Sequence, residues 1–281
     1  MTATERPRPL SFGAASVRIF DLSLGEMLWS RRSLFLALIV GGPVVLAAAI
    51  RTVVTIEPAA FPRVNGLTIG GPTIFGMMIW LLYVRFVVPV LGVFYGTSLI
   101  ADEVEDRTIT YLFTRPIPRG AVVIGKYFAY LACTVLLVLP SVVLVYFLVA
   151  PLGGGGIGES VPMLLSDLGM IGAGLAAYGA VFAVVGATFK RPVVAGLLFA
   201  FGWEPAVLLV PGYLKQLSVG YYLQALVPHG MPHDSAVASV LQAIADPPAA
   251  GAAIVALAVI TGAGLWLAAR TVETREYILE Q

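Results

Sequence analysis

Charge is what this sequence has least of. Asp, Glu, Lys and Arg make up only 12% of its 281 residues, against roughly 25% in an ordinary soluble domain. Hydrophobic residues make up 59%. Because so apolar a chain has too few polar side chains to cover a surface in water, the composition excludes a soluble domain and predicts an integral membrane protein.

Cysteine and histidine are also scarce. The single Cys133 excludes a disulfide within the chain, and its place in an apolar run is typical of a small buried residue. An intramembrane enzyme would need a nucleophile beside a base, or metal ligands, at membrane depth. Neither Cys133 nor Ser98 has such a neighbour in the sequence. We therefore expect no enzyme, although an intramembrane enzyme stays an alternative.

A nucleotide-binding motif is missing too. The nearest match to the phosphate-binding pattern Gly-x-x-x-x-Gly-Lys-Ser/Thr is "GGGGIGES", Gly153 to Ser160. Glu159 stands where the pattern needs the lysine that meets the phosphates. We expect no ATP hydrolysis and no cofactor on this chain, and we expect no nucleic-acid partner for a membrane protein of this kind.

Long apolar runs are what the sequence has in abundance. A membrane-spanning helix needs about 20 mainly apolar residues, and six runs meet or nearly meet that length. The second run is the longest and at about 1.5 Å per residue exceeds one crossing, so it must tilt, protrude or begin as an outer cap. The sequence predicts an all-α membrane protein with one domain, 13–281, and six spans: Ser33–Ile50, Thr73–Ile100, Tyr127–Ala150, Gly169–Phe189, Pro192–Val210 and Ala249–Ala269.

Lys and Arg near the spans predict the direction of insertion, because they concentrate on the cytoplasmic side. With six spans both termini lie on one side, and that side carries thirteen basic residues against three on the other (Arg51, Arg63 and Lys215). We expect a protein of the cytoplasmic membrane with both termini in the cytoplasm. The thirteen are Arg6, Arg8, Arg18, Arg31, Arg32, Arg107, Arg115, Arg119, Lys126, Lys190, Arg191, Arg270 and Arg275.

The chain before the first span is polar. Its first residues, 1–12, are rich in Pro and Arg and are expected to have no fixed structure. In "ASVRIFDLSLGEMLWSRR", the residues Val17, Phe20, Leu24 and Met27 recur at helical spacing. This spacing predicts an amphipathic helix on the inner membrane surface, and a cytoplasmic extension of the first span is the alternative. We expect no cleavable signal peptide, because this polar stretch precedes the first apolar run.

The connection between the second and third spans is the most polar internal segment: "LIADEVEDRTITYLFTRPIPRGAVVIGKY", Leu99 to Tyr127. Asp106 or Thr108 can cap a short helix at "TITYLFT", and Pro116 and Pro118 would stop it. A charged ring around a small apolar face suits docking of another protein; folding back onto the lipid surface is the alternative. That apolar face would consist of Ile109, Leu112 and Phe113.

The wider segment "GTSLIADEVEDRTITYLFTRPIPRGAVVIGKYFAYL" resembles the signature of permease subunits of type-2 ABC (ATP-binding cassette) exporters. That family has an acidic residue closing the second span, a Leu-rich turn, a Pro-Ile/Val-Ser/Pro-Arg element, and Gly-Lys opening the third span. Arg107 departs from the pattern by standing where Gly is common. The matching positions are Glu103, Thr108, Leu112, Pro116, Ile117, Arg119, Gly125 and Lys126.

The resemblance implies that the short helix is a coupling helix, seated in a cleft of a separate cytoplasmic ABC ATPase subunit that would hold ATP and Mg. It also implies a second permease copy, in a homodimer or heterodimer, surrounded by membrane lipid. We expect the permease of an ATP-driven exporter; a secondary transporter is the alternative, although no repeated halves with broken helices are evident. The residues expected to couple to the ATPase are Glu103, Asp106, Thr108, Ile109, Leu112, Phe113, Arg115, Pro116 and Arg119.

Two charges lie inside apolar runs, Arg85 in "IWLLYVRFVVPVLG" and Glu204 in "LLFAFGWEPAVLLV". Each would cost about 2.5–3.5 kcal/mol at mid-bilayer, so each should face protein or water. Their helical distances from the inner ends of their runs are similar, about 22 Å and about 18 Å. We hypothesise an ion pair between the second and fifth spans; two residues separately reaching the outer interface are the alternative.

The fifth span is expected to be interrupted at "WEP" and again at Pro211-Gly212. By the resemblance, the region that follows makes re-entrant helices at the outer exit, with Glu204 near their base. Gly and Ala crowd the fourth and sixth spans and would let helices approach closely. That crowding serves internal packing as readily as dimerisation.

A possible metal site lies in the outer segment "PHGMPHD", which offers His229, Met231 and His233. Alternating imidazole and thioether groups could bind copper, and one branch of the resembling family serves copper-site assembly in nitrous oxide reductase. Solvated loop residues are the alternative, and we assign no metal.

Overall fold

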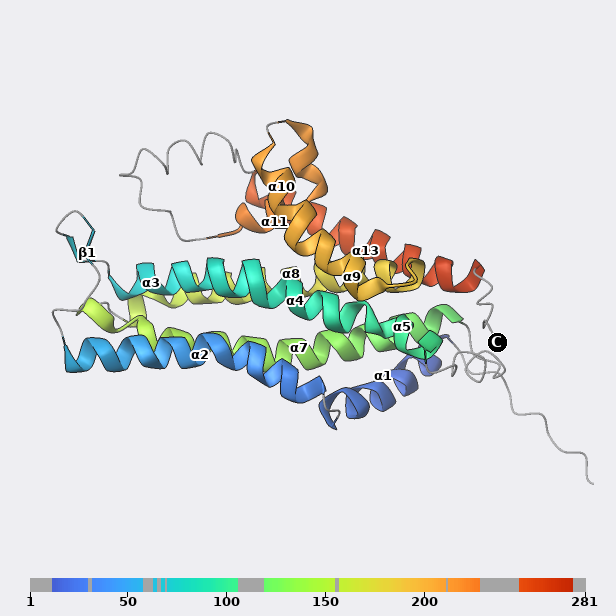
Figure 1. Ribbon diagram of the computed structural model, residues 1–281, viewed down its shortest axis with the longest axis horizontal. Coiled ribbons are helices and arrows are strands. Elements are labelled where there is room, and N and C mark those ends of the chain that lie inside the picture. Colours follow the sequence, from blue (N-terminus) through green and yellow to red (C-terminus); the bar gives the residue numbers. More distant parts are fainter. Residues whose placement is uncertain are drawn as a thin grey trace, which may run out of the picture.

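Four long helical stretches lie along the length of the computed structural model (Figure 1). They are α2 (Arg32–Ile56), the second stretch from α3 (Gly71–Met78) to α5 (Ser98–Glu105), α7 (Arg119–Val149) and α8 (Ile157–Thr188). A fifth long helix, α13 (Ala250–Thr274), leans across α8. The structure describes residues 12–29, 32–57, 63–64, 67–68, 70–105, 119–154, 157–210, 212–227 and 248–274.

Five helices of the described residues are long and apolar enough to cross a membrane: Leu34–Ile56, Gly71–Asp102, Gly120–Val149, Ser160–Thr188 and Ala250–Thr274. A shorter apolar helix, Pro192–Leu208, stands where the sequence predicts the fifth span. The helical character and these five helices agree with an integral membrane protein, and the count of six spans stays a prediction.

The two ends of the bundle differ. At one end, here called the α1 end, lie α1 (Phe12–Trp29), α5, the beginning of α7 and the end of α13 (Figure 1). At the other, the β1 end, a short antiparallel pair, β1 (Arg63–Val64) and β2 (Leu67–Thr68), connects α2 to α3. The ends of α5 and α7 next to residues 106–118 therefore lie at the same end as α1.

The second helical stretch and the shorter apolar helix Pro192–Leu208 contain π-helical turns. In the second stretch, η2 (Ile79–Val87), α4 (Val88–Leu91) and η3 (Gly92–Gly96) separate α3 from α5. In the shorter helix, η5 (Leu198–Trp203) separates α9 (Pro192–Leu197) from α10 (Glu204–Leu209). A π turn inserts an extra residue into the helical ladder, and such turns are frequent at functional sites. The expected break at "WEP" is thus a change of helix type rather than a gap.

Buried tyrosines join α7 to α8. The hydroxyl of Tyr127 donates to the carbonyl oxygen of Ala176 at 2.9 Å, and that of Tyr130 donates to Leu175 at 3.0 Å. A buried tyrosine needs such a partner because its hydroxyl would otherwise lose its hydrogen bonds to water. These two bonds fix the register of α7 against α8.

The small residues of α8 and α13 serve packing within the chain. At Gly264 of α13, an added Cβ would lie 3.1 Å from the backbone and side chain of Ala180 on α8. The close approach is possible because neither residue carries a large side chain. Of the two uses the sequence allows, the internal one is observed.

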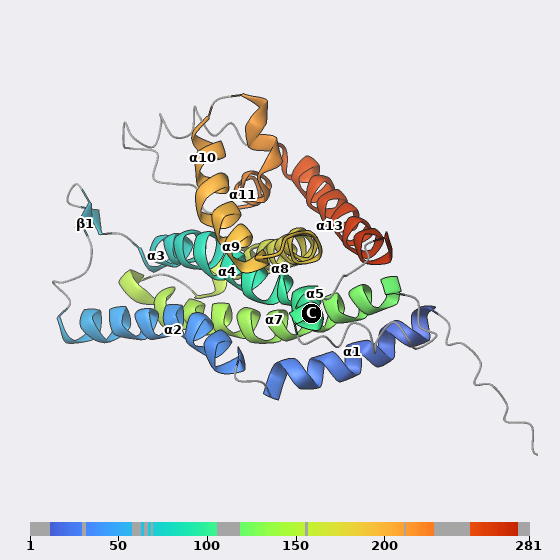
Figure 2. The ribbon, with the colours of Figure 1, turned by 45° about the vertical axis from the view of Figure 1, so that its right-hand side comes forward.

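α1 is a helix of its own, set at an angle to α2 and packed against α7 (Figure 2). The hydroxyl of Ser16 donates to the carbonyl oxygen of Ala121 on α7 at 3.3 Å. Leu24 and Met27 pack partly against the core, as the predicted apolar face requires, whereas Val17 is 60% exposed. The face turned to α7 thus differs in part from the face read from the sequence.

Two helices begin earlier than their apolar runs. The third span is expected from Tyr127, but α7 begins at Arg119; the fourth is expected from Gly169, but α8 begins at Ile157. The difference arises because hydrophobicity ends at the first charged residues, whereas backbone hydrogen bonding continues through them.

After α10 the chain folds back on itself. Gly212 has φ 118°, a left-handed conformation that side chains disfavour, and it allows the turn into η6 (Tyr213–Leu217). Next, α11 (Val219–Gln224) lies beside α10 (Figures 1 and 2). We call α10, η6 and α11 together the α10–α11 hairpin.

Candidate functional site

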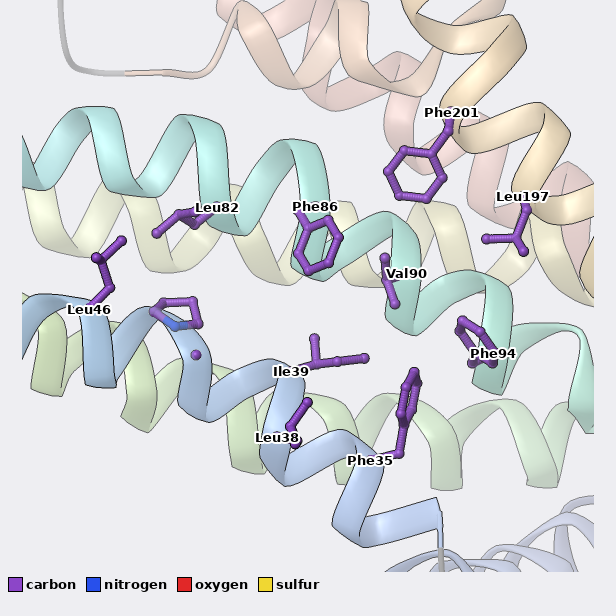
Figure 3. A pocket seen from close by; sticks show the side chains of 12 residues that line it. Phe35, Leu38, Ile39, Leu46, Leu82, Phe86, Val90, Phe94, Leu197 and Phe201 are labelled. Carbon is purple, nitrogen blue, oxygen red and sulfur yellow. The ribbon is translucent and has the colours of Figure 1, made fainter.

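A groove of about 550 Å³ lies between three helical segments (Figure 3). Its side chains come from α2, from the stretch between η2 and η3, and from α9 and η5. All of them are apolar, and cavities with such linings stay dry and accept apolar ligands. The groove is lined by Phe35, Leu38, Ile39, Gly42, Pro43, Leu46, Leu82, Phe86, Val90, Phe94, Leu197 and Phe201.

Aromatic pairs hold the edges of the groove together. Phe35 of α2 packs against Phe94 of η3 with ring centroids 4.8 Å apart, and Phe86 of η2 lies 6.3 Å from Phe201 of η5 (Figure 3). Such tilted or edge-on pairs are favourable beyond the area that they bury. Leu38 is nevertheless 73% exposed, so the groove is open along its side.

Arg85, the predicted intramembrane cation, lies in η2 and is partly buried. Its guanidinium carbon lies 4.9 Å from the centre of the Trp80 ring. Stacking on an aromatic face partly replaces water around a cation.

Glu204, the predicted intramembrane acid, is the first residue of α10 and only 4% exposed. One carboxylate oxygen, Oε1, accepts hydrogen bonds from the Ser218 hydroxyl at 3.2 Å, the Val219 amide at 2.8 Å and the Gly220 amide at 3.3 Å. The other, Oε2, accepts from the hydroxyl of Tyr178 on α8. Four donors thus surround the carboxylate.

The hypothesised ion pair between Arg85 and Glu204 is therefore not the arrangement observed within one chain. Arg85 stacks on Trp80, and the Glu204 carboxylate is bonded to hydroxyl and amide groups. The physical reason is that four oriented donors can compensate a buried carboxylate without a counter-ion. The similar depth of Arg85 and Glu204 along their spans, which suggested the ion pair, gave no sign of these separate contacts.

The residues expected to couple to an ATPase lie mostly in 106–118, outside the described residues. Glu103 lies in α5 and Arg119 is the first residue of α7. Outside the described residues are Asp106, Thr108, Ile109, Leu112, Phe113, Arg115 and Pro116.

The first turns of α7 are held on two sides. On one side α1 approaches so closely that a Cβ on Gly125 would lie 2.6 Å from the carbonyl oxygen of Ser16. On the other side Glu273 of α13 lies beside Gly120, with its Oε1 3.0 Å from the position of an added Cβ. The beginning of α7, the helix that follows residues 106–118, thus packs against both α1 and α13.

The possible copper ligands His229, Met231 and His233 also lie outside the described residues. Sequence reasoning missed Tyr178 and Ser218, the side-chain partners of Glu204. It also missed Asp167, which is fully buried in α8 and which the sequence reading placed before the fourth span. Apolar surroundings at Tyr178 were the available signal, since a buried tyrosine hydroxyl needs a partner.

Comparison with known families gives one result and comparison with curated proteins gives none. Residues 35–267 match the family described as ABC-2 family transporter protein. No curated protein matches the chain. The matched range includes the groove, Arg85, Glu204 and residues 106–118, and the chain belongs to the ABC-2 transporter family of multi-pass membrane proteins.

Proposed function

We propose that this chain is the permease of an ATP-driven exporter in the cytoplasmic membrane, powered by a separate ABC ATPase subunit. The family supports a role in transport across a membrane and, in general, association with an ABC ATPase. Export, both termini in the cytoplasm and a homodimer are the further parts of the proposal. The excess of Lys and Arg near the α1 end supports its cytoplasmic location.

The observation that carries the coupling mechanism is the position of α5 and α7 on either side of residues 106–118. Both helices end there at the α1 end, and both continue as long helical stretches toward the β1 end (Figure 1). A push on a short helix between them would travel along both stretches, because helices are stiff compared with loops. Because α1 and α13 both pack against the beginning of α7, that movement would be passed on to the rest of the bundle.

We propose that the groove forms part of the path or of its wall. Its apolar lining supports cargo with a substantial apolar part, such as an amphipathic or lipid-linked molecule. Because the groove is open along its side, a second copy of the chain would be needed to enclose a path. The two π-helical stretches that border it support movement there.

The test is to purify the permease with its ATPase in lipid nanodiscs and to measure complex formation and ATP hydrolysis. Leu112→Asp with Phe113→Asp should abolish stimulation of the ATPase by the permease, because a charged face cannot enter an apolar cleft. Leu112→Met, which keeps apolar volume, is the matched control and should retain stimulation. Equal stimulation by the aspartate variant would exclude this coupling segment, and absence of any ATPase partner would favour a secondary transporter.

A further inference from the structure

Arg85 is a cation near the middle of an apolar helix. It lies close to the centre of the membrane-length segment Gly71–Asp102, and its side chain is only partly buried. Among the described residues its guanidinium contacts the Trp80 ring, and no ion pair or hydrogen bond of the guanidinium is seen among them. Because a charge at this depth is costly, it marks a place where a charged ligand or cargo is expected.

Trp80 positions the guanidinium without using its donors. η2 is a π-helix, whose hydrogen bonds run from residue i to i+5, and this geometry places Trp80 and Arg85 one turn apart. A cation above an aromatic face is held by the charge distribution of the ring and not by hydrogen bonds. The N–H donors of Arg85 therefore find no acceptor in this contact, and they suit the paired oxygens of a carboxylate or a phosphate.

The buried acid Glu204 does not supply that acceptor. Its Oε2 accepts from Tyr178, and its Oε1 accepts from the Ser218 hydroxyl and from two amides at the start of α11. A carboxylate with four donors already has its lone pairs directed to them. The donors of Arg85 thus stay available to an anion from outside the described part of the chain.

The face of η2 that carries Arg85 borders the open side of the groove. Leu81, four residues before Arg85 and so on the same face of the helix, is 60% exposed. Phe86, the next residue in the chain, lines the groove and is 48% exposed. A molecule in the groove can therefore reach Arg85 along an exposed surface.

The guanidinium lies toward one end of the groove. On the second helical stretch the lining residues run from Leu82 to Phe94, and Trp80 comes just before the first of them (Figure 3). Long side chains on a helix turn back toward its N-terminus, as Arg85 does to reach Trp80. An apolar tail in the groove and an anionic head at Arg85 would thus follow one another along the stretch.

We propose that the groove and Arg85 together bind an anionic amphiphile, whose apolar chain lies between Leu82 and Phe94 and whose phosphate or carboxylate head is held by Arg85 beside Trp80. A cationic head would be repelled there, and a neutral head would leave the guanidinium unpaired. Ordinary bilayer lipids keep their head groups outside the hydrocarbon core, so a head group at this depth belongs to a molecule in transit. That this molecule is cargo rests on the proposed function.

The first test compares three probes on the full chain in nanodiscs of zwitterionic phosphatidylcholine. Each has the same hexadecyl chain with a photoreactive diazirine, and the heads are phosphate, trimethylammonium and glucoside. After illumination, mass spectrometry of the labelled peptides should show the phosphate probe on residues 35–46 and 82–94 about tenfold more than the other two, the effect of one charge-assisted hydrogen bond. On the exposed side of α13, at Val255 and Val259, the three probes should label equally.

Arg85→Gln should remove the preference for phosphate at the groove, and Arg85→Lys, which keeps the charge, should retain part of it. The matched control is Arg270→Gln, because Arg270 also stacks on a tryptophan, Trp266, but lies on α13. It should leave the preference unchanged. Equal labelling of the groove by all three probes in the unsubstituted chain, or an unchanged preference in Arg85→Gln, overturns the anion site.

The second test separates bound cargo from a bound lipid. With the ATPase subunit present, the phosphate probe should raise the rate of ATP hydrolysis severalfold, and Arg85→Gln should lose that rise. Selective labelling without any rise in rate overturns the role as cargo. If no ATPase binds, the proposed function fails while selective labelling still supports the site; if the ATPase binds but labelling is not selective, the site alone is wrong.

Discussion

Gly125 on α7 lies directly against the backbone carbonyl of Ser16 on α1, so closely that a methyl group on Gly125 would come within 2.6 Å of that oxygen. The contact joins the first helix of the chain to the helix that follows residues 106–118. It also gives a physical reason for glycine at this position of the motif, beyond the sequence resemblance.

We predict that Gly125→Ala separates α1 from α7. The added Cβ would overlap backbone as well as the Ile19 side chain, which lies 2.9 Å from its position, and overpacking of this kind costs about 1–3 kcal/mol. Thermal unfolding in detergent should show a lower midpoint. Gly25→Ala in α1 is the control, because a Cβ there meets nothing within 4 Å; a lower midpoint for the control alone would contradict the packing.

Filling the groove should block movement without destabilising the fold. Gly42 lines the groove, and an added Cβ there meets nothing within 4 Å. Gly42→Leu should therefore place its side chain in the open space and lower the ATPase rate of the complex severalfold while the unfolding midpoint stays the same or rises. Gly41→Leu, at a neighbouring position that does not line the groove and is equally free of close atoms, should keep the rate, and equal inhibition by both would exclude the groove as the cause.

Arg51 should slow hydrogen exchange of backbone amides at the end of α7 nearest β1. Its Nη1 donates to the carbonyl oxygens of Phe147 and Leu148, both at 3.1 Å, where the helix leaves carbonyls without helical partners and a cation is favoured. Arg51→Met should make the amides of Val149 and Ala150 exchange hydrogen faster. Arg270→Met, whose guanidinium stacks on Trp266 at 5.4 Å, is the control; unchanged exchange in Arg51→Met would show that the two bonds add nothing.

Exchanging the two intramembrane charges should not restore the protein. Glu204→Arg places N–H groups against the amides of Val219 and Gly220, so donor meets donor and a buried charge stays uncompensated. Adding Arg85→Glu does not remove that conflict, because the amides of Val219 and Gly220 would still face the new arginine. Recovery of monodisperse protein by the double variant, measured by size-exclusion chromatography, would instead indicate a direct ion pair.

Much of the fold follows from the sequence because the membrane reduces the choice of structure. Every backbone polar group in the bilayer must find a partner in the chain, so an apolar run such as Ser33–Ile50 becomes a helix. The position of α1 before α2 was also predictable from its spacing of apolar residues. The beginnings of α7 and α8 were not, since helices extend through Lys126 and Asp167 while apolar runs end there.

The candidate site was predictable only in its isolated members. Apolar surroundings alone indicated that Arg85 and Glu204 need partners. The partners themselves come from distant parts of the chain: Trp80 for Arg85, and Tyr178 and Ser218 for Glu204. The similar distances of Arg85 and Glu204 along their helices suggested an ion pair because such distances measure depth in the membrane. They carry no information about which faces of the two helices meet.

The sequence by itself determined that this chain is a helical membrane protein and, through residues 99–127, the transporter family that it resembles; composition and local pattern act within one helix or one loop. Only the tertiary structure decided that a buried carboxylate closes a hairpin and that three helical segments line an open apolar groove. Those features depend on how helices rotate and approach one another. That packing depends on many close contacts at once, such as Gly125 against Ser16, which no single segment contains.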